Sequence, residues 1–209
     1  MPARAGFFGF PRISGIIEMM FKNQPMKPRK LLTGLYLTKM MITTSLFAGL
    51  FMACGAQQKH LTAGDPVPLF SLKDQQDSLF NISDFIGKKI LVVYFYPKDE
   101  SSVCTKEACS FRDAYADFTG AGAMVIGINS GSVESHRHFQ TNHQLPFTLL
   151  SDPGNRVLKL FGVRSKFLIS GRETFVIDKS GKIRFTYDSF TNGPAHEAEA
   201  LKFIKTLPA

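Results

Sequence analysis

At 209 residues, with 44% apolar and 20% charged residues, the chain has the size and composition of a soluble protein with one sizeable domain. Its net charge of +8 would suit nucleic acid or an anionic membrane, but residues 1–53 carry +6 of it, since seven Lys and Arg there face a single acid, Glu18. The near-neutral remainder lacks a nucleic-acid footprint, so no nucleic-acid partner is expected. The basic leader needs its own explanation.

The leader has the pattern of a targeting segment. Residues 26–39 are basic and free of acids, and the fourteen residues 40–53 are uncharged and mostly apolar. That run is shorter than the roughly 20 residues of a membrane span. Cys54 follows it directly, as in a bacterial lipoprotein signal, where this cysteine is lipidated. We therefore predict a signal and a lipoprotein tethered to the bacterial cell envelope. An organellar transit peptide, an uncleaved anchor and a cytoplasmic location remain alternatives.

A polar linker, 54–64, precedes a domain predicted over 65–209. Apolar periodicity and turn residues predict its elements. In chain order these are a β-hairpin at 67–82, a buried strand at 88–96, a helix at 104–118, a second buried strand at 123–129, a polar helix at 132–143, a strand at 147–152, a short helix at 154–163, a hairpin at 174–187 and an amphipathic helix at 195–207.

Buried strands that alternate with helices imply right-handed crossovers and a central sheet covered on both faces. The C-terminal hairpin adds antiparallel strands. We therefore predict an α/β domain with a mixed central β-sheet flanked by helices, thioredoxin-like in outline, with an N-terminal β-hairpin. Sites in such sheets lie at the carboxyl ends of the strands. Cys104 follows the strand 88–96 and starts the next helix, so it lies where a site is expected.

Cys104 and Cys109 stand five positions apart in a chain with three cysteines. A helix start favours the reactive thiolate form of a cysteine, and Ser101 or Ser102 can cap that helix. On an ideal helix the two Cα atoms would lie roughly 8–9 Å apart, whereas a disulfide needs less than about 7 Å. A static disulfide would conflict with the helix, but a transient one needs only local unwinding. A static crosslink, a metal clip and an inert buried thiol remain alternatives.

The histidines of the polar helix do not extend this site. His136, His138 and His143 do not share a helix face, and we interpret them as solvated surface residues. Zinc needs four ligands, and no second Cys or His pair is spaced to complete such a set. The sequence therefore predicts no metal.

The segment "YPKDESSVCTKEACSFRD" resembles the active-site segment of peroxiredoxins of the Q type, also called bacterioferritin comigratory proteins. The family pattern Pro-x-x-x-Thr/Ser-x-x-Cys is met by Pro97, Ser101 and Cys104, and Glu107 also matches. The resemblance covers about residues 62–207. It departs from the family in two ways: Ser101 replaces the commoner Thr, and "SSVC" replaces "TPGC".

Two further residues take their roles from this resemblance. Cys109 falls where many Q-type members carry their resolving cysteine, and "GRETFVID" matches the segment that supplies the active-site arginine, here Arg172. Without the resemblance, Arg172 would be interpreted as half of a surface salt bridge.

The resemblance implies a thiol-dependent peroxidase that acts in antioxidant defence. The Cys104 thiolate would attack hydrogen peroxide or an organic hydroperoxide and become a sulfenic acid. Arg172 would stabilise the charge and Ser101 would orient the peroxide. Cys109 would then form a disulfide with Cys104, which thioredoxin or a similar dithiol would reduce. No cofactor is needed, and a monomer is expected. The alternative from another class is a non-enzymatic, envelope-tethered thiol-redox sensor or adaptor.

Overall fold

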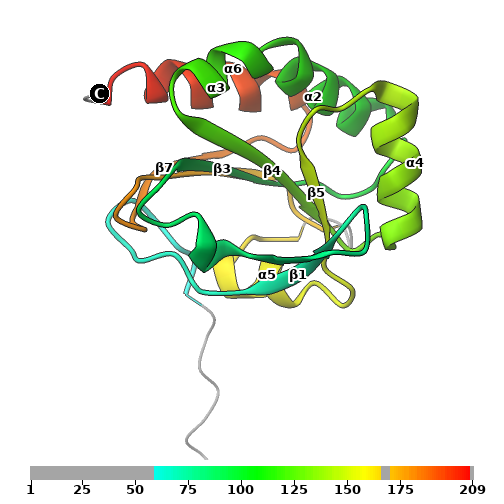
Figure 1. Cartoon of the computed structure of the whole chain (residues 1–209), viewed down its shortest axis with the longest axis horizontal. Helices are drawn as coiled ribbons and strands as arrows, with labels where there is room; N and C mark the ends of the chain where they lie inside the picture. The colour runs from blue at the N-terminus through cyan, green and yellow to red at the C-terminus, as the bar shows by residue number, and fades with distance from the viewer. Residues whose placement is uncertain (1–58, 166–169, 208–209) are drawn as a thin grey trace, which may run out of the picture. The chain divides into compact units, whose positions relative to one another are not determined.

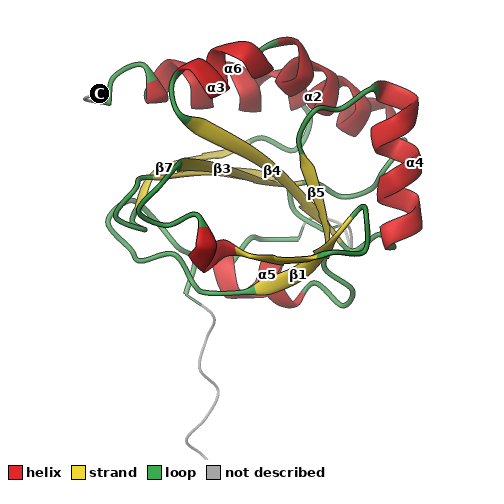
Figure 2. Cartoon of the chain, viewed as in Figure 1, coloured by secondary structure: helices red, strands yellow, loops and turns green. Residues whose placement is uncertain are grey.

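The computed structural model describes residues 59–165 and 170–207. The predicted targeting segment and Cys54 lie outside the described residues. Helices connect the successive strands from β3 to β6 (Figure 1), and Figure 2 shows the same chain coloured by secondary structure. In chain order they are β1 (Ser71–Asp74), β2 (Leu79–Asn81), the 3-10 helix η1 (Ile82–Asp84), β3 (Ile90–Phe95), α2 (Ser102–Asp113), α3 (Tyr115–Gly120), β4 (Ala123–Asn129), α4 (Val133–His143), β5 (Thr148–Ser151), α5 (Arg156–Phe161), β6 (Glu173–Ile177), β7 (Ile183–Asp188) and α6 (Gly193–Ile204).

The strands form one mixed sheet of seven strands in the order β2-β1-β5-β4-β3-β6-β7. β3, β4 and β5 run parallel to one another, whereas β1 and β6 pair antiparallel with β5 and β3. Helices α2, α3 and α6 lie over one face of the sheet, and α5 lies on the other (Figure 1). The prediction of a mixed, thioredoxin-like sheet flanked by helices, with an N-terminal hairpin, is confirmed.

The central strand β3 explains why the sheet is covered on both faces. All six of its residues are buried, and side chains of a strand point alternately to opposite faces. Leu91, Val93 and Phe95 join the core cluster that includes α5. Val92 and Tyr94 join the cluster that includes Cys104 and the α2 and α6 side chains. The continuous apolar run in the sequence therefore reflects two cores, one on each side of the same strand.

The segment predicted as one helix over 104–118 is two helices, so that prediction is wrong in its extent. α2 begins at Ser102, two residues earlier than expected, and α3 follows it after Ala114. Ala114 has φ −93° and ψ 5°, outside the α-helical region, and its N–H bonds to the Ser110 carbonyl. Neither Gly nor Pro marks this break. Cys104 and Cys109 nevertheless lie in the same helix, α2.

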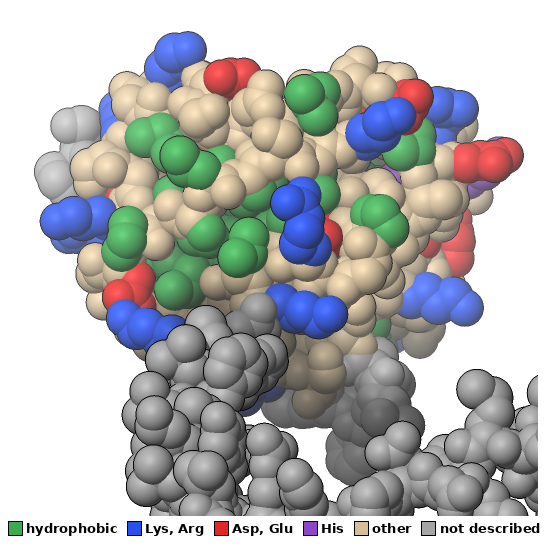
Figure 3. All heavy atoms as spheres, turned by 90° about the horizontal axis from the view of Figure 1, so that it is seen from below, with side chains coloured by type: hydrophobic (Ala, Val, Ile, Leu, Met, Phe, Trp, Pro, Cys, Tyr) green, Lys and Arg blue, Asp and Glu red, His purple; other side chains and the backbone are tan. Residues whose placement is uncertain are grey.

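The face that carries β1 and α5 shows hydrophobic side chains scattered among charged ones of both signs (Figure 3). The large exposed hydrophobic side chains of the described residues are Leu69, Leu79 and Leu160. No helix in residues 59–165 and 170–207 is both long and apolar enough to cross a membrane.

Candidate active site

Cys104 lies where the chain leaves the sheet. β3 ends at Phe95, a loop from Pro97 to Ser101 follows, and Cys104 is the third residue of α2. Its side chain is buried and its thiol is free. The sulfur therefore lies at the carboxyl end of a central strand and in the first turn of a helix, where backbone N–H groups point toward an anion.

A buried arginine contacts the Cys104 sulfur. The Arg172 Nη2 donates to Cys104 Sγ at 3.1 Å, and Nη1 donates to the Glu107 carboxylate. The Nε donates to the Phe190 carbonyl at 3.2 Å. Arg172 is only 3% exposed, so the alternative of a surface salt bridge does not hold. The guanidinium fork fixes one positive charge beside the sulfur by three separate bonds.

Ser101 stands beside this group but does not act as the predicted cap. It is the N-cap residue of α2, yet its side chain makes no capping bond. Its hydroxyl instead donates to the Lys98 carbonyl at 3.2 Å. A cavity of about 500 Å³ opens next to Arg172. It is lined by Pro97, Lys98, Ser101, Ser102, Val103, Ser170, Arg172 and Phe190.

Behind Glu107 lies a buried histidine that the sequence analysis missed. His196 is fully buried; its Nε2 lies 2.9 Å from the Ser189 carbonyl and its Nδ1 lies 2.9 Å from the Thr174 hydroxyl. A carbonyl only accepts, so Nε2 carries the proton. Burial, together with the charge of Arg172, lowers the pKa of His196 to about 4. His196 is therefore neutral at pH 7, and the Thr174 hydroxyl donates to its Nδ1.

The sequence held a signal for this histidine. His196 lies four residues before Ala200 and so continues the apolar face that Ala200 and Ile204 present on the amphipathic helix. The Oε1 of Glu107 lies 3.7 Å from the Nδ1 of His196. Among the described residues this oxygen has no hydrogen-bond partner.

The prediction that the α4 histidines are solvated is wrong for His136. This side chain is fully buried, and its Nδ1 lies 2.8 Å from Asp99 Oδ2. His138 is exposed, as predicted, and pairs with Glu134 at 3.8 Å. His143 is partly buried and lies 2.8 Å from Glu100. Two histidines of α4 thus reach the loop that precedes Cys104.

Cys109 is half-buried and free, five residues after Cys104. Both residues lie in the continuous helix α2. Regular helix geometry separates their Cα atoms by roughly 8–9 Å, so a disulfide between them requires this helix to open.

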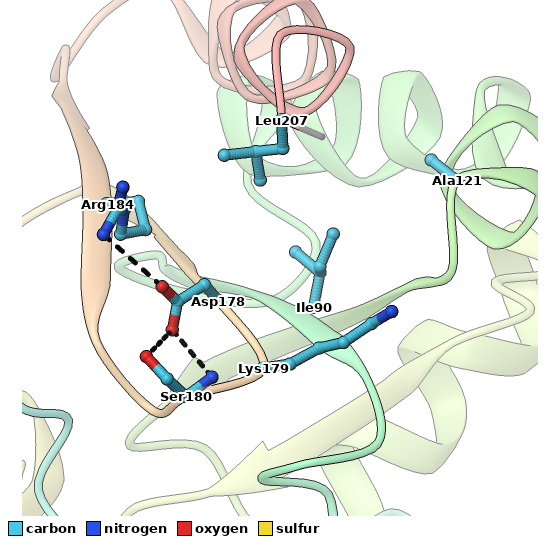
Figure 4. Close-up of a pocket in the computed structure, with 7 residues that line it drawn as sticks. All are labelled: Ile90, Ala121, Asp178, Lys179, Ser180, Arg184 and Leu207. Atoms are coloured by element: carbon cyan, nitrogen blue, oxygen red, sulfur yellow. Dashed lines mark hydrogen bonds and ion pairs between the residues drawn. The ribbon is translucent and has the colours of Figure 1, made fainter. Parts of the chain in front are cut away.

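A second cavity, of about 310 Å³, lies away from this chemistry. Figure 4 shows it at Ile90, the first residue of β3, with Leu207 and Ala121 on other sides. Its acid, Asp178, accepts from Ser180 in the β6–β7 turn and pairs with Arg184 at 3.6 Å. Its lining holds neither Cys nor His. Among the described residues, no group of three or more His, Cys, Asp or Glu side chains is placed to hold a metal ion.

Known proteins are similar to this chain in both sequence and fold. The AhpC/TSA family model matches residues 63–186. The chloroplastic peroxiredoxin Q of Sedum lineare is 47% identical over 149 residues, which are 70% of this chain and 80% of that protein. The peroxidoxin BcpB of Mycobacterium tuberculosis superposes with a TM-score of 0.68 and 32% identity, over 72% of this chain and 100% of that one. The bacterioferritin comigratory protein of Xanthomonas campestris gives a TM-score of 0.62 and 25% identity, over 68% and 98%.

These likenesses first define a class, the thiol-dependent peroxidases with a thioredoxin-like fold. The chain belongs to the AhpC/TSA family and, within it, to the peroxiredoxin Q proteins. It is therefore a peroxidase and an oxidoreductase. The resemblance noted at "YPKDESSVCTKEACSFRD" is confirmed, and the non-enzymatic sensor is not favoured.

Proposed function

We propose that Cys104 is the peroxidatic residue and that Arg172 is its electrostatic partner. The observation that carries this proposal is the 3.1 Å contact between Arg172 Nη2 and Cys104 Sγ, both buried beside the cavity that Ser101 lines. A permanent positive charge at this distance stabilises the thiolate and the negative charge that develops on oxygen as the peroxide bond breaks. Glu107 orients the guanidinium through Nη1.

The first step transfers one oxygen atom. The thiolate sulfur attacks the nearer peroxide oxygen, the O–O bond breaks, and the leaving oxygen takes a proton to become water or an alcohol. The sulfur is oxidised by two electrons to a sulfenic acid, and the peroxide is reduced by the same two electrons. Ser101 and Pro97 line the cavity at the start of α2. We propose that the Ser101 hydroxyl, which donates to the Lys98 carbonyl at 3.2 Å, turns to the peroxide and orients it.

The cavity suits both small and organic peroxides. Its volume of about 500 Å³ exceeds what hydrogen peroxide fills, and Pro97, Val103 and Phe190 give it apolar walls. The Xanthomonas campestris relative has alkyl peroxide reduction activity. We therefore expect this chain to reduce organic hydroperoxides as well as hydrogen peroxide, with no cofactor.

Cys109 completes the cycle as the resolving residue. Its thiolate attacks the sulfenic sulfur of Cys104 and releases water, which leaves a disulfide. A dithiol such as thioredoxin then reduces that disulfide, so the net reaction consumes one dithiol for each peroxide. The first turns of α2 must open for the bond to form, and helix ends open at low free-energy cost.

We expect two results from this resolving step. Cys109→Ser should complete one turnover and then stall when thioredoxin is the reductant. In the wild-type protein, oxidation should speed amide hydrogen exchange at residues 104–112 while 90–95 change much less, because only the helix must open. A coupled thioredoxin assay measures the turnover of Cys109→Ser, and mass spectrometry measures the amide hydrogen exchange of the wild-type protein. Equal steady-state rates in wild type and Cys109→Ser would contradict the resolving role.

The leader is proposed to target the protein to an organelle and then to be removed. The relatives in Sedum lineare and Arabidopsis thaliana are chloroplastic, which favours the transit-peptide alternative. The comparisons do not support the envelope lipoprotein. We propose that the domain from residue 65 onward acts as a monomer, which the mass of the purified protein in solution would test.

Cys54→Ser tests the destination of the chain. If the leader is a transit peptide, the variant should be cleaved at the same site as wild type. It should also keep the wild-type distribution between membrane and soluble fractions. A shift of the protein from membranes, together with the loss of a lipid-sized mass, would instead establish lipidation at Cys54. Intact-mass analysis of the mature protein and cell fractionation provide both measurements.

A further inference from the structure

Two consecutive loop residues, Asp99 and Glu100, are both held by helix α4. Asp99 Oδ2 accepts from Ser135 Oγ at 2.6 Å and lies 2.8 Å from His136 Nδ1. Glu100 accepts from Asn142 Nδ2 at 2.9 Å and lies 2.8 Å from His143 Nε2. We call these four contacts the α4 clamp. It acts on the loop immediately before α2, the helix that must open for a disulfide to form.

The Asp99 half of the clamp is a fixed anchor. The Nε2 of His136 lies 3.2 Å from the Leu150 carbonyl, which can only accept, so Nε2 carries a proton. The other Asp99 oxygen accepts from Tyr96 and Asn129, each at 2.8 Å. Burial alone would raise the pKa of Asp99, but the hydrogen bond and charge of His136, with the other donors, hold it below its ordinary value. A satisfied buried network of this kind is rigid.

The Glu100 half is exposed and its backbone is strained. Glu100 has φ 59°, in the left-handed region that non-glycine residues avoid. Its side chain is 48% exposed, and that of His143 is 23% exposed. The hydrogen bond from His143 is the main cause that holds the pKa of Glu100 below its ordinary value. An exposed ion pair contributes little free energy, so these contacts hold the strained backbone only weakly.

We propose that Glu100 is a positioning residue that sets how readily the first turn of α2 opens, with Asp99 as the anchor on which the loop pivots. Glu100 directly precedes Ser101, the N-cap of α2. When the Glu100 side chain leaves Asn142 and His143, its strained backbone is free to relax and α2 loses its fixed start. The proposal rests on the Cys104–Cys109 disulfide step and adds the element that controls it.

The two chemical steps then require opposite states of the clamp. Attack on peroxide needs α2 closed, because Cys104 must lie against Arg172. Disulfide formation needs α2 open. A looser Glu100 therefore slows the first step and speeds the second. Faster disulfide formation also protects the sulfenic acid from a second peroxide, which would convert it irreversibly to the sulfinic acid.

Three substitutions of Glu100 in the full chain separate the effect of its side-chain contacts from the effect of its strained backbone. Glu100→Ala removes the contacts and keeps the strain. Glu100→Gln keeps an amide that bonds to Asn142 and His143. Glu100→Gly removes the contacts but also the strain, because glycine adopts a positive φ freely. His138→Asn is the matched control, since it removes an exposed histidine of the same helix that pairs with Glu134 at 3.8 Å and does not contact the loop before α2 among the described residues.

Stopped-flow mixing with hydrogen peroxide, followed by acid quench, alkylation and peptide mass spectrometry, resolves sulfenic acid, disulfide and sulfinic acid at each cysteine. In Glu100→Ala we expect disulfide formation about two- to fivefold faster and attack on peroxide slower by a similar factor, the scale of losing partly exposed hydrogen bonds. The sulfinic fraction should fall. Glu100→Gln and His138→Asn should match wild type, and Glu100→Gly should lie between wild type and Ala.

Unchanged rates in Glu100→Ala would overturn the proposal, and so would a slowing of both steps, which would indicate general damage to the fold. If wild type forms no Cys104–Cys109 bond at all, the resolving step of the proposed function fails by itself. The clamp is then judged by amide exchange of the reduced protein at residues 105–107, the first amides of α2 that bond within the helix, beginning with Thr105 N–H to the Ser101 carbonyl. This measurement does not depend on Cys109. Faster exchange in Glu100→Ala than in Glu100→Gly supports it, and equal exchange in all variants refutes it.

Discussion

Cys104→Ser should reduce peroxide consumption to the background rate, with every peroxide tested. A serine hydroxyl does not ionise at neutral pH and is a far weaker nucleophile than a thiolate. Arg172 would still find an acceptor in the serine oxygen, so we expect the fold and the thermal unfolding temperature to stay close to those of wild type. A coupled assay with thioredoxin and its reductase, run beside a thermal melt, measures both quantities.

Cys109→Ser is the matched control for this loss. It removes a thiol from the same helix but should retain one full turnover, seen as a burst of peroxide consumption equal to the enzyme concentration. Peroxide consumption by Cys104→Ser at a rate comparable to that of wild type would show that the chemistry resides elsewhere. A melt far below that of wild type would instead assign the loss to misfolding.

Local patterns predicted most of the fold. The strand at 123–129 was predicted with the bounds of β4, because an apolar run enclosed by Gly and Asn leaves little choice. The run at 88–96 contains β3, which is shorter, Ile90–Phe95, and buried on both faces as predicted. The break after Asp113 could not be predicted from local sequence, because Ala114 is a good helix former and its non-helical φ and ψ follow no Gly or Pro signal.

Only those features of the site that lie within one continuous segment of the sequence were predictable. Cys104 at the start of a helix follows from the strand, loop and helix around it. The burial of Arg172 did not follow, since its partner Cys104 lies 68 positions away, and only the family resemblance pointed to it. His136 was misjudged because the helix that carries it is mostly polar, and its acceptor, Asp99, is 37 positions distant. A polar residue is buried when a distant partner satisfies it, and no local pattern reports that partner.

Arg172→Met should produce two large effects that a second substitution can separate. The guanidinium supplies the charge beside Cys104 Sγ and also neutralises Glu107, which is fully buried. Its loss should lower kcat/KM for peroxide by about 10²–10³-fold, the scale of removing one donor at a developing oxyanion. It should also destabilise the fold by about 3–5 kcal/mol, because a buried carboxylate is left without its counterion.

The double variant Arg172→Met with Glu107→Gln distinguishes catalysis from stability. A neutral amide no longer needs the counterion, so most of the lost free energy of unfolding should return, as urea denaturation would report. The peroxide rate should stay low, because the charge beside the sulfur is still missing. Arg184→Met, which removes an exposed arginine from strand β7, should change neither quantity appreciably. If the double variant regained the wild-type rate along with its stability, Arg172 would act only as a structural counterion, and its charge would have no part in the chemistry of Cys104.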